Sequence, residues 1–306
     1  MRTKNLNGSN LSGRSILLKL KPYLFLLPIY LLMMIFKYIP FFNAIVKSFY
    51  KWNGGNVNVY IGVKNYSDIL KSKQFWISLT NCLKICLANI GIGLTTPLLA
   101  AELLYAVRSN KKQYIIRTLL TFPMVVPNVI VILLWKWILA GDTGVLNSIL
   151  RSIGLETLTS PWLGSSKTAL FSVILVGFPW VSGLNFLLYY GALQSIPHEI
   201  LEAATIDGAN KVQRFFRVDI PLLASQIKLI ITLALINGVQ VFETIFILTS
   251  GGPGTATMVP SILLYDSAFS FKKYGYSSAV GVIMFVLIML ITVFNQRFLK
   301  DTESGE

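Results

Sequence analysis

The chain has 306 residues, of which 54% are hydrophobic and only 13% are charged. A soluble globular domain usually has about a quarter charged residues, so this composition, with a mean hydropathy of +0.64, excludes that class and indicates a membrane protein. The formal charge of +14 does not indicate a nucleic-acid partner, because the basic residues are spread in small groups along the chain, as in proteins whose loop charges set membrane topology.

Long apolar runs divide the chain. They reach the roughly 20 residues that cross a hydrocarbon core, where backbone amides must bond within a helix or a closed barrel, and their continuous apolarity favours helices. Prolines at positions 97, 123, 127 and 179 predict kinks inside these runs. We therefore expect an all-α membrane protein with one transmembrane domain over residues 22–300. The six predicted spans are Tyr23 to Val46, Phe75 to Tyr105, Leu119 to Ala140, Thr168 to Tyr190, Leu222 to Thr249 and Ser277 to Phe298.

Loop charges predict the orientation of these spans. With the N-terminus inside, the inner segments hold fourteen Lys and Arg and the outer loops hold nine, and cytoplasmic loops normally carry the excess. The basic segment 1–21 and the tail 301–306 are then both cytoplasmic. Because no small-residue cleavage site follows the first run, we interpret that run as an uncleaved anchor.

The two cysteines, Cys82 and Cys86, are four residues apart within an apolar run. They could share a helix face and ligate a metal, but no further Cys or nearby His completes a site. We interpret them as small packing residues and predict no metal.

The longest polar stretch on the predicted inner side is the loop 194–221. Pro197 suits a first helical turn, Gly208 supplies a helix stop, and a second short helix follows with two adjacent phenylalanines. Small alanines and aromatic anchors predict a helix–turn–helix that enters a groove of a partner protein. The alternative is an amphipathic segment on the lipid surface, which its carboxylates disfavour. These carboxylates are Glu199, Glu202, Asp207 and Asp219.

The run EAATIDGA at 202–209, followed by Phe215 and by Pro221, closely resembles the EAA loop of the permease subunits of binding-protein-dependent ABC importers. The resemblance implies a type I importer permease fold, with this loop as a cytoplasmic coupling helix between the fourth and fifth spans that seats in the ATP-binding subunit. The docking residues that it implies are Glu202, Ala203, Ala204, Asp207, Gly208, Phe215 and Phe216. The chain departs from the family at two points: the family often has Thr-Leu before the loop proline and a second proline four residues later, where this chain has Asp219-Ile220 and Ser225. We expect these substitutions to soften the loop's exit and to leave the docking residues intact.

Weaker motifs are similar to the maltose and glycerol-phosphate permeases of this family. They include FPMVVP at 122–127, QSIP at 194–197 and LTSGGP at 248–253. The resemblance implies that the solute is a carbohydrate, with an oligosaccharide preferred over a monosaccharide or glycerol phosphate.

Polar residues inside the fifth span form a second candidate site. Asn237, Gln240 and Glu243 follow at three-residue steps, which places them roughly along one helical stripe. Such a stripe could hydrogen-bond sugar hydroxyls or could hold helices together. In carbohydrate permeases the sugar contacts lie on this span and the one before it, which implies a role for Trp180, Asn185 and Tyr189 on the preceding span.

The chain has no G-x-x-x-x-G-K-[S/T] phosphate loop and no catalytic dyad, so we predict a non-enzymatic subunit. The resemblance implies that ATP and Mg are bound by two partner ATPase subunits. It also implies a second permease of different sequence, an extracytoplasmic solute-binding protein, and a place in the bacterial cytoplasmic membrane. Two rivals are a secondary transporter, for which Glu243 alone is thin support, and a membrane scaffold that only recruits a partner.

Overall fold

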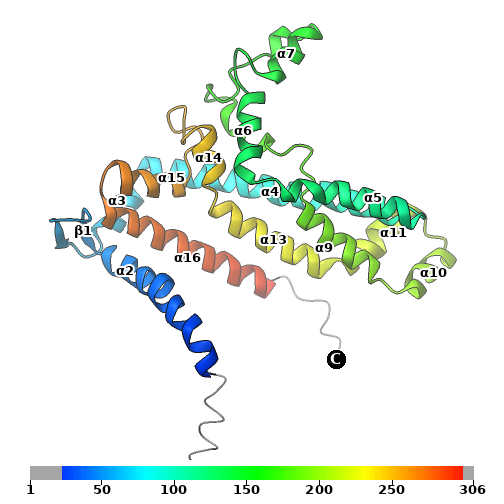
Figure 1. Cartoon of the computed structure of the whole chain (residues 1–306), viewed down its shortest axis with the longest axis horizontal. Helices are drawn as coiled ribbons and strands as arrows, with labels where there is room; N and C mark the ends of the chain where they lie inside the picture. Colours follow the sequence, from blue (N-terminus) through cyan, green and yellow to red (C-terminus); the bar gives the residue numbers. More distant parts are fainter. Residues whose placement is uncertain (1–22, 299–306) are drawn as a thin grey trace, which may run out of the picture.

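The computed structural model describes residues 23–298. The predictions for the segment 1–21 and the tail 301–306 fall outside these described residues. Figure 1 shows an elongated molecule in which several helices run side by side along the long axis. A two-stranded hairpin and short helices lie at one end, and the polar loop after α9 (Gly183–Gln194) lies at the other.

The first helix runs from Tyr23 to Lys47 and includes η1 (Met34–Tyr38) and α2 (Ile39–Lys47). The elements that follow up to the middle of the chain are β1 (Tyr50–Trp52), β2 (Asn58–Tyr60), α3 (Lys64–Lys71), α4 (Lys73–Tyr105), α5 (Asn110–Thr121), η2 (Phe122–Val125), α6 (Asn128–Ile138), α7 (Val145–Ser152) and η3 (Glu156–Leu158). The remaining elements are α8 (Ala169–Leu175), α9, α10 (His198–Ile206), α11 (Lys211–Arg214), η4 (Phe215–Asp219), α12 (Ile220–Leu222), α13 (Ala224–Val239), α14 (Glu243–Leu248), α15 (Pro260–Tyr265), η5 (Asp266–Ser270) and α16 (Tyr274–Phe298).

Three helices of the described chain are long and apolar enough to cross a membrane. They are Tyr23–Lys47, Lys73–Tyr105 and Tyr274–Arg297, and they match the first, second and sixth predicted spans closely. Two bent helix pairs bring the number of candidate spans to as many as five. The helical fold class is therefore confirmed, while the count of six spans stays a prediction.

The three middle spans are each broken into separate helices, which goes further than the proline kinks that the sequence predicts. The third span bends by 88° between η2 and α6, where Pro123 and Pro127 interrupt backbone hydrogen bonding. The expected span at 168–190 is split into α8 and α9 by a segment with a positive φ at Gly177 and Trp180. The fifth ends as a regular helix at Val239, and a separate helix, α14, follows it.

The helix α4 is the structural axis of the molecule, packing against α13 and α9. It stays continuous through Pro97, which cannot bond to the carbonyl of Gly93 four residues earlier. The hydroxyl of Tyr189 on α9 donates to that carbonyl at 3.3 Å and so satisfies it from a neighbouring helix. On the other side α13 approaches closely at Gly238, where an added Cβ would lie 2.3 Å from the sulfur of Cys86.

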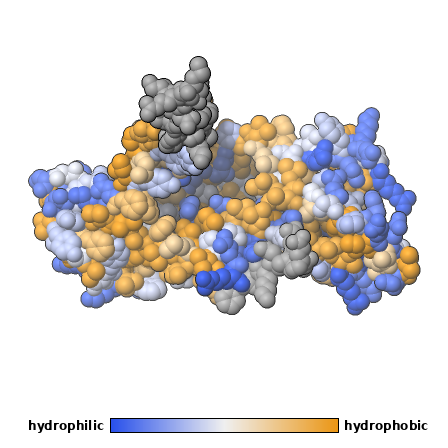
Figure 2. Space-filling model, turned by 90° about the horizontal axis from the view of Figure 1, so that it is seen from below, coloured by the Kyte–Doolittle hydropathy of each residue, from blue (hydrophilic) through white to orange (hydrophobic). Residues whose placement is uncertain are grey.

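Hydrophobic and hydrophilic residues divide the surface along the same axis. Figure 2 shows hydrophobic residues over much of the middle of the molecule and hydrophilic residues gathered at its two ends. We name these the hairpin end, which holds β1, β2 and α3, and the loop end, which holds α10, α11 and α12. A hydrophobic surface in the middle with a hydrophilic surface at each end is the distribution expected for a protein whose long axis crosses a bilayer.

Candidate functional site

The first part of the polar loop forms the predicted helix. Pro197 is the N-cap residue of α10, and Glu199 lies in its first turn, where a carboxylate favours the positive end of the helix dipole. The helix ends at Ile206 with Asp207 as its C-cap residue, and Gly208 follows with a φ of +77°. An added Cβ at Gly208 would meet nothing within 4 Å, so it is the backbone conformation rather than crowding that requires glycine there.

The surface of α10 is open on the side that carries the predicted docking residues. Glu202, Ala203, Asp207 and Gly208 are exposed, and Ala204 is half-buried. Ile206, the last residue of the helix, is a large apolar side chain that is 85% exposed.

Ile206 is not the only large apolar side chain of the loop that is exposed. Val212 and Phe216 are also exposed large apolar residues, and we refer to Ile206, Val212 and Phe216 together as the apolar tip. The signal that could have found it is the pair Ile206 and Val212, apolar residues standing among charged and polar ones.

The two adjacent phenylalanines have different surroundings. Phe215 is half-buried and packs against the buried cluster of α4, α9 and α13, whereas Phe216 is 61% exposed. Their rings meet edge to face with centroids 4.9 Å apart. Phe215 thus anchors the loop to the helical bundle, and Phe216 is available to a partner.

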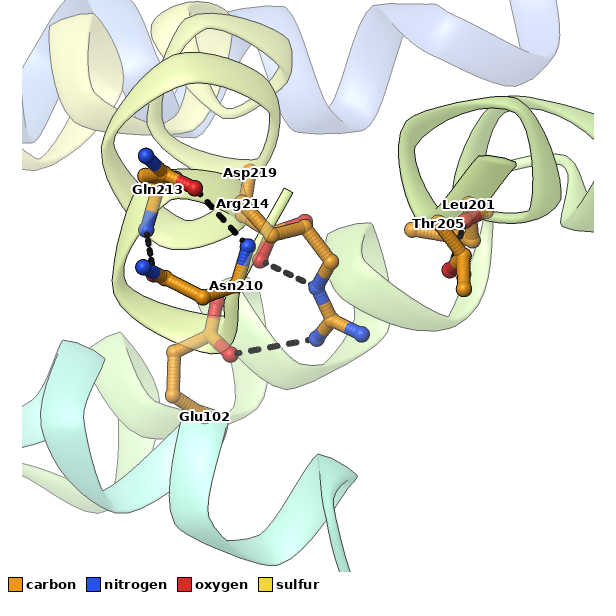
Figure 3. A network of polar contacts seen from close by, with 7 residues as sticks. All are labelled: Glu102, Leu201, Thr205, Asn210, Gln213, Arg214 and Asp219. Atoms are coloured by element: carbon orange, nitrogen blue, oxygen red, sulfur yellow. Dashed lines mark hydrogen bonds and ion pairs between the residues drawn. The ribbon is translucent and has the colours of Figure 1, made fainter. Parts of the chain in front are cut away.

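The second part of the loop is fixed by a polar network (Figure 3). A capping box starts α11: the Asn210 side chain accepts from the Gln213 amide nitrogen, and the Gln213 side chain accepts from the Asn210 amide nitrogen, both at 2.9 Å. Arg214 then donates from Nε to Oδ2 of Asp219 at 3.0 Å. Its other end lies 4.0 Å from Oε2 of Glu102, near the end of α4.

Asp219, which was expected to soften the exit of the loop, is held by an ion pair. The side chain of Asp219 is completely buried, and an isolated buried carboxylate is costly unless it is paired. The pair with Arg214 therefore holds the start and the end of this segment together. The arrangement has two carboxylates for one guanidinium, and within residues 23–298 Oε1 of Glu102 and Oδ1 of Asp219 have no hydrogen-bond partner.

A second candidate site lies where α4, α9 and α13 meet. A cavity of about 270 Å³ is bordered by three amide side chains, Asn89, Asn185 and Asn237, together with Ser182. We name it the amide cavity. Asn185 and Asn237 were predicted, whereas Asn89 was not, although an asparagine in the apolar run of α4 was a visible signal. Amides donate and accept hydrogen bonds at once, which suits hydroxyl groups.

The other predicted pathway residues do not join the amide cavity. The stripe expected from Asn237 through Gln240 to Glu243 is not formed, because the helix ends at Val239 and restarts at Glu243. Gln240 borders a different, mostly apolar cavity between α2 and α16. Oε2 of Glu243 accepts from Nδ2 of Asn128 on α6 at 2.6 Å.

The two aromatic candidates on the fourth span have partners within the chain. Tyr189 is fully buried, and its hydroxyl donates a hydrogen bond to the carbonyl of Gly93. Trp180 lies in the break before α9, where its indole Nε1 donates to the carbonyl of Ile174 at 3.0 Å and its own carbonyl accepts from Thr96 at 2.9 Å. These contacts give both residues a structural role in the isolated chain.

Sequence comparison places the chain in a family. Residues 93–303 match the model of the binding-protein-dependent transport system inner membrane component, and the chain belongs to this family of importer permeases. It is 35% identical over 284 residues to the probable ABC transporter permease protein YurN of Bacillus subtilis, an alignment that covers 92% of this chain and 97% of the relative.

Two further matches extend over nearly the whole chain. The multiple sugar-binding transport system permease protein MsmF of Streptococcus mutans is 31% identical, with 95% of this chain and 99% of the relative covered. A solved bacterial ABC transporter that imports the acidic polysaccharide alginate contains a chain that superposes with a TM-score of 0.81 at 25% identity, covering 95% of this chain and 98% of that one. The fold is therefore that of an ABC importer permease.

Proposed function

We propose that this chain is a transmembrane permease subunit that imports a carbohydrate, an oligosaccharide, at the expense of ATP hydrolysed by other subunits. The observation that carries the proposal is the exposed surface of α10. This helix ends in a turn that requires glycine, and the part of the loop after the turn is fixed to the helical bundle. The full-length similarity to permeases named for sugar or arabinooligosaccharide transport supports the carbohydrate.

The loop end is the part of the chain that contacts the ATPase subunit and moves when ATP is hydrolysed. In the proposed arrangement α10 and the apolar tip lie in a groove of an ATPase subunit, which binds ATP and Mg, and Glu202 and Asp207 pair with basic residues of that groove. Movement of α10 reaches the bundle through Phe215 and through the Arg214–Asp219 pair beside α4. The helices then alternate between an outward-open and an inward-open arrangement.

The amide cavity is the part that contacts the solute. Its three asparagines come from three different helices, α4, α9 and α13, so a rearrangement of these helices changes the cavity. A carbohydrate presents many hydroxyl groups, each able to donate and accept, and neutral amides match them without the cost of burying a charge.

The membrane arrangement and the partners follow from the same assignment. The loop end faces the cytoplasm, both termini are cytoplasmic, and six spans cross the bacterial cytoplasmic membrane. The first helix, Tyr23–Lys47, has an apolar stretch with none of its residues buried within the described chain. A second permease and lipid cover it, while two ATPase subunits and an extracytoplasmic solute-binding protein complete the importer.

The test is uptake by the assembled transporter in proteoliposomes, supplied with ATP, the solute-binding protein and a panel of labelled sugars. Asn237→Leu should lower uptake of the accepted sugar by roughly fivefold to thirtyfold, because it removes one or two hydrogen bonds of about 1 kcal/mol each. Gln240→Leu is the matched control, since Gln240 lies next to the same helix but borders another cavity. Equal uptake by wild type and Asn237→Leu would exclude the amide cavity as the solute site. An absence of uptake of every sugar would exclude a carbohydrate as the solute.

A further inference from the structure

The hairpin end contains a basic pocket that no step of transport described above uses. Its volume is about 540 Å³. The residues that border it come from β1, the hairpin turn, α3 and the segment before α16. They are Lys51, Trp52, Asn53, Val57, Ile61, Lys64, Asn65, Asp68, Lys272, Lys273 and Tyr276.

The charge of this pocket is one-sided. Four lysines border it against the single carboxylate of Asp68, and all four are exposed. Within residues 23–298 none of them forms a salt bridge, because the two ion pairs found there both belong to Arg214 at the loop end. A concave surface lined by unpaired charges of one sign concentrates the field and attracts groups of the opposite sign.

The same end opposes the general rule for loop charges. Seven lysines lie in the two segments that form it, at positions 47, 51, 64, 71, 73, 272 and 273. In the proposed orientation this end is extracytoplasmic, where Lys and Arg are normally depleted. A local excess that works against topology therefore needs a separate cause, and an anionic partner supplies one.

The pocket is also held in a fixed shape. Asn65 on α3 is buried and donates from Nδ2 to the carbonyls of Ser48 and Tyr50, at 2.7 and 3.0 Å. On the other side α16 lies directly against β1, since a Cβ added to Gly275 would be 1.9 Å from the Tyr50 carbonyl oxygen. A rigid surface loses little conformational entropy when a partner binds.

We infer that this basic pocket is a docking site for an acidic surface of the solute-binding protein. The inference rests on the proposed function, which places this end outside the membrane and requires such a protein to approach it. Complementary charge would speed the encounter and orient the binding protein over the permease.

Two other anionic occupants fit the position less well. The pocket shares no bordering residue with the amide cavity, so an acidic sugar bound here would not be on the way to it. Anionic lipid attracts basic segments mainly at the cytoplasmic leaflet. The lysines of the pocket also lie on the chain that joins the ends of apolar helices rather than along their sides.

The test measures binding of the fluorescently labelled solute-binding protein to the complete transporter in nanodiscs of phosphatidylcholine. Lys64→Glu with Lys273→Glu should raise Kd by about tenfold at low ionic strength, chiefly through slower association. The difference should shrink to within about twofold near 1 M salt, where the Debye length is about 3 Å. Lys51→Glu with Lys272→Glu is a second, independent pair that should have the same effect.

The matched control is Lys111→Glu with Lys112→Glu, an exposed lysine pair on α5 whose reversal changes the net charge equally. It should leave Kd unchanged, and basal ATPase activity should show that every variant assembles. Equal Kd values for wild type and both pocket pairs would overturn the inference, as would an effect that appears only when anionic lipid is added. A wild-type transporter that binds no solute-binding protein would instead contradict the proposed function.

Discussion

The two ends of the molecule are stabilised in different ways. At the hairpin end, neutral hydrogen bonds and close backbone contacts fix a compact unit whose charges point outward unpaired. At the loop end, the second half is fixed by a buried ion pair, while the apolar and acidic residues of α10 remain open. We infer from this difference that the hairpin end offers a rigid surface to which a partner binds. The loop end contains a helix, α10, that moves while the rest of the loop stays attached to the helical bundle.

The largest effect is expected where a single ion pair holds the loop. Arg214→Ala would leave the Asp219 carboxylate buried and unpaired, which typically costs 3–5 kcal/mol, and we expect about 3 because Arg214 is partly exposed. The measurement is the free energy of unfolding of the chain in detergent. Arg217→Ala, an exposed arginine of the same segment, should change it by less than about 0.5 kcal/mol. Similar values for the two variants would show that the loop end is not held by this pair.

A smaller effect is expected at the hairpin end, because its fixing contacts are neutral. Asn65→Leu removes two hydrogen bonds to the carbonyls of Ser48 and Tyr50 and should lower the free energy of unfolding by about 2 kcal/mol. Asn56→Leu, in the exposed hairpin turn, is the control and should have almost no effect. If Asn65→Leu cost as much as Arg214→Ala, the contrast between the two ends would be lost.

The sequence predicts those features that depend on local composition. The first helix, α4 and α16 are long, predominantly apolar runs, so their bounds follow from apolarity within a few residues. The start of α10 and the turn at Gly208 follow from the local chemistry of proline, carboxylates and glycine.

Features that depend on contacts between distant segments were not predictable in the same way. Tyr189 looked like a sugar contact, yet its hydroxyl satisfies the carbonyl that Pro97 frees on another helix. Asp219 looked like a substitution that loosens the loop, yet it is buried beside Arg214. Both roles require knowing which helices are neighbours, and periodicity along one segment does not contain that information.

The central claim, that the loop end couples ATP hydrolysis to import, depends most directly on the turn after α10. Gly208→Val places a β-branched side chain at a φ of +77°, which costs about 1–2 kcal/mol and should shift α10 relative to the ATPase. Gly154→Val is a close control, because Gly154 has the same φ of +77° and nothing within 4 Å, but lies after α7, outside the loop.

The decisive measurement is ATP-driven uptake together with ATPase activity, in proteoliposomes that contain either variant. We predict that Gly208→Val lowers uptake by roughly tenfold and abolishes the stimulation of ATPase by the solute-binding protein. Gly154→Val should retain both activities. Wild-type uptake and wild-type stimulation in Gly208→Val would contradict the assignment of this loop as the coupling element.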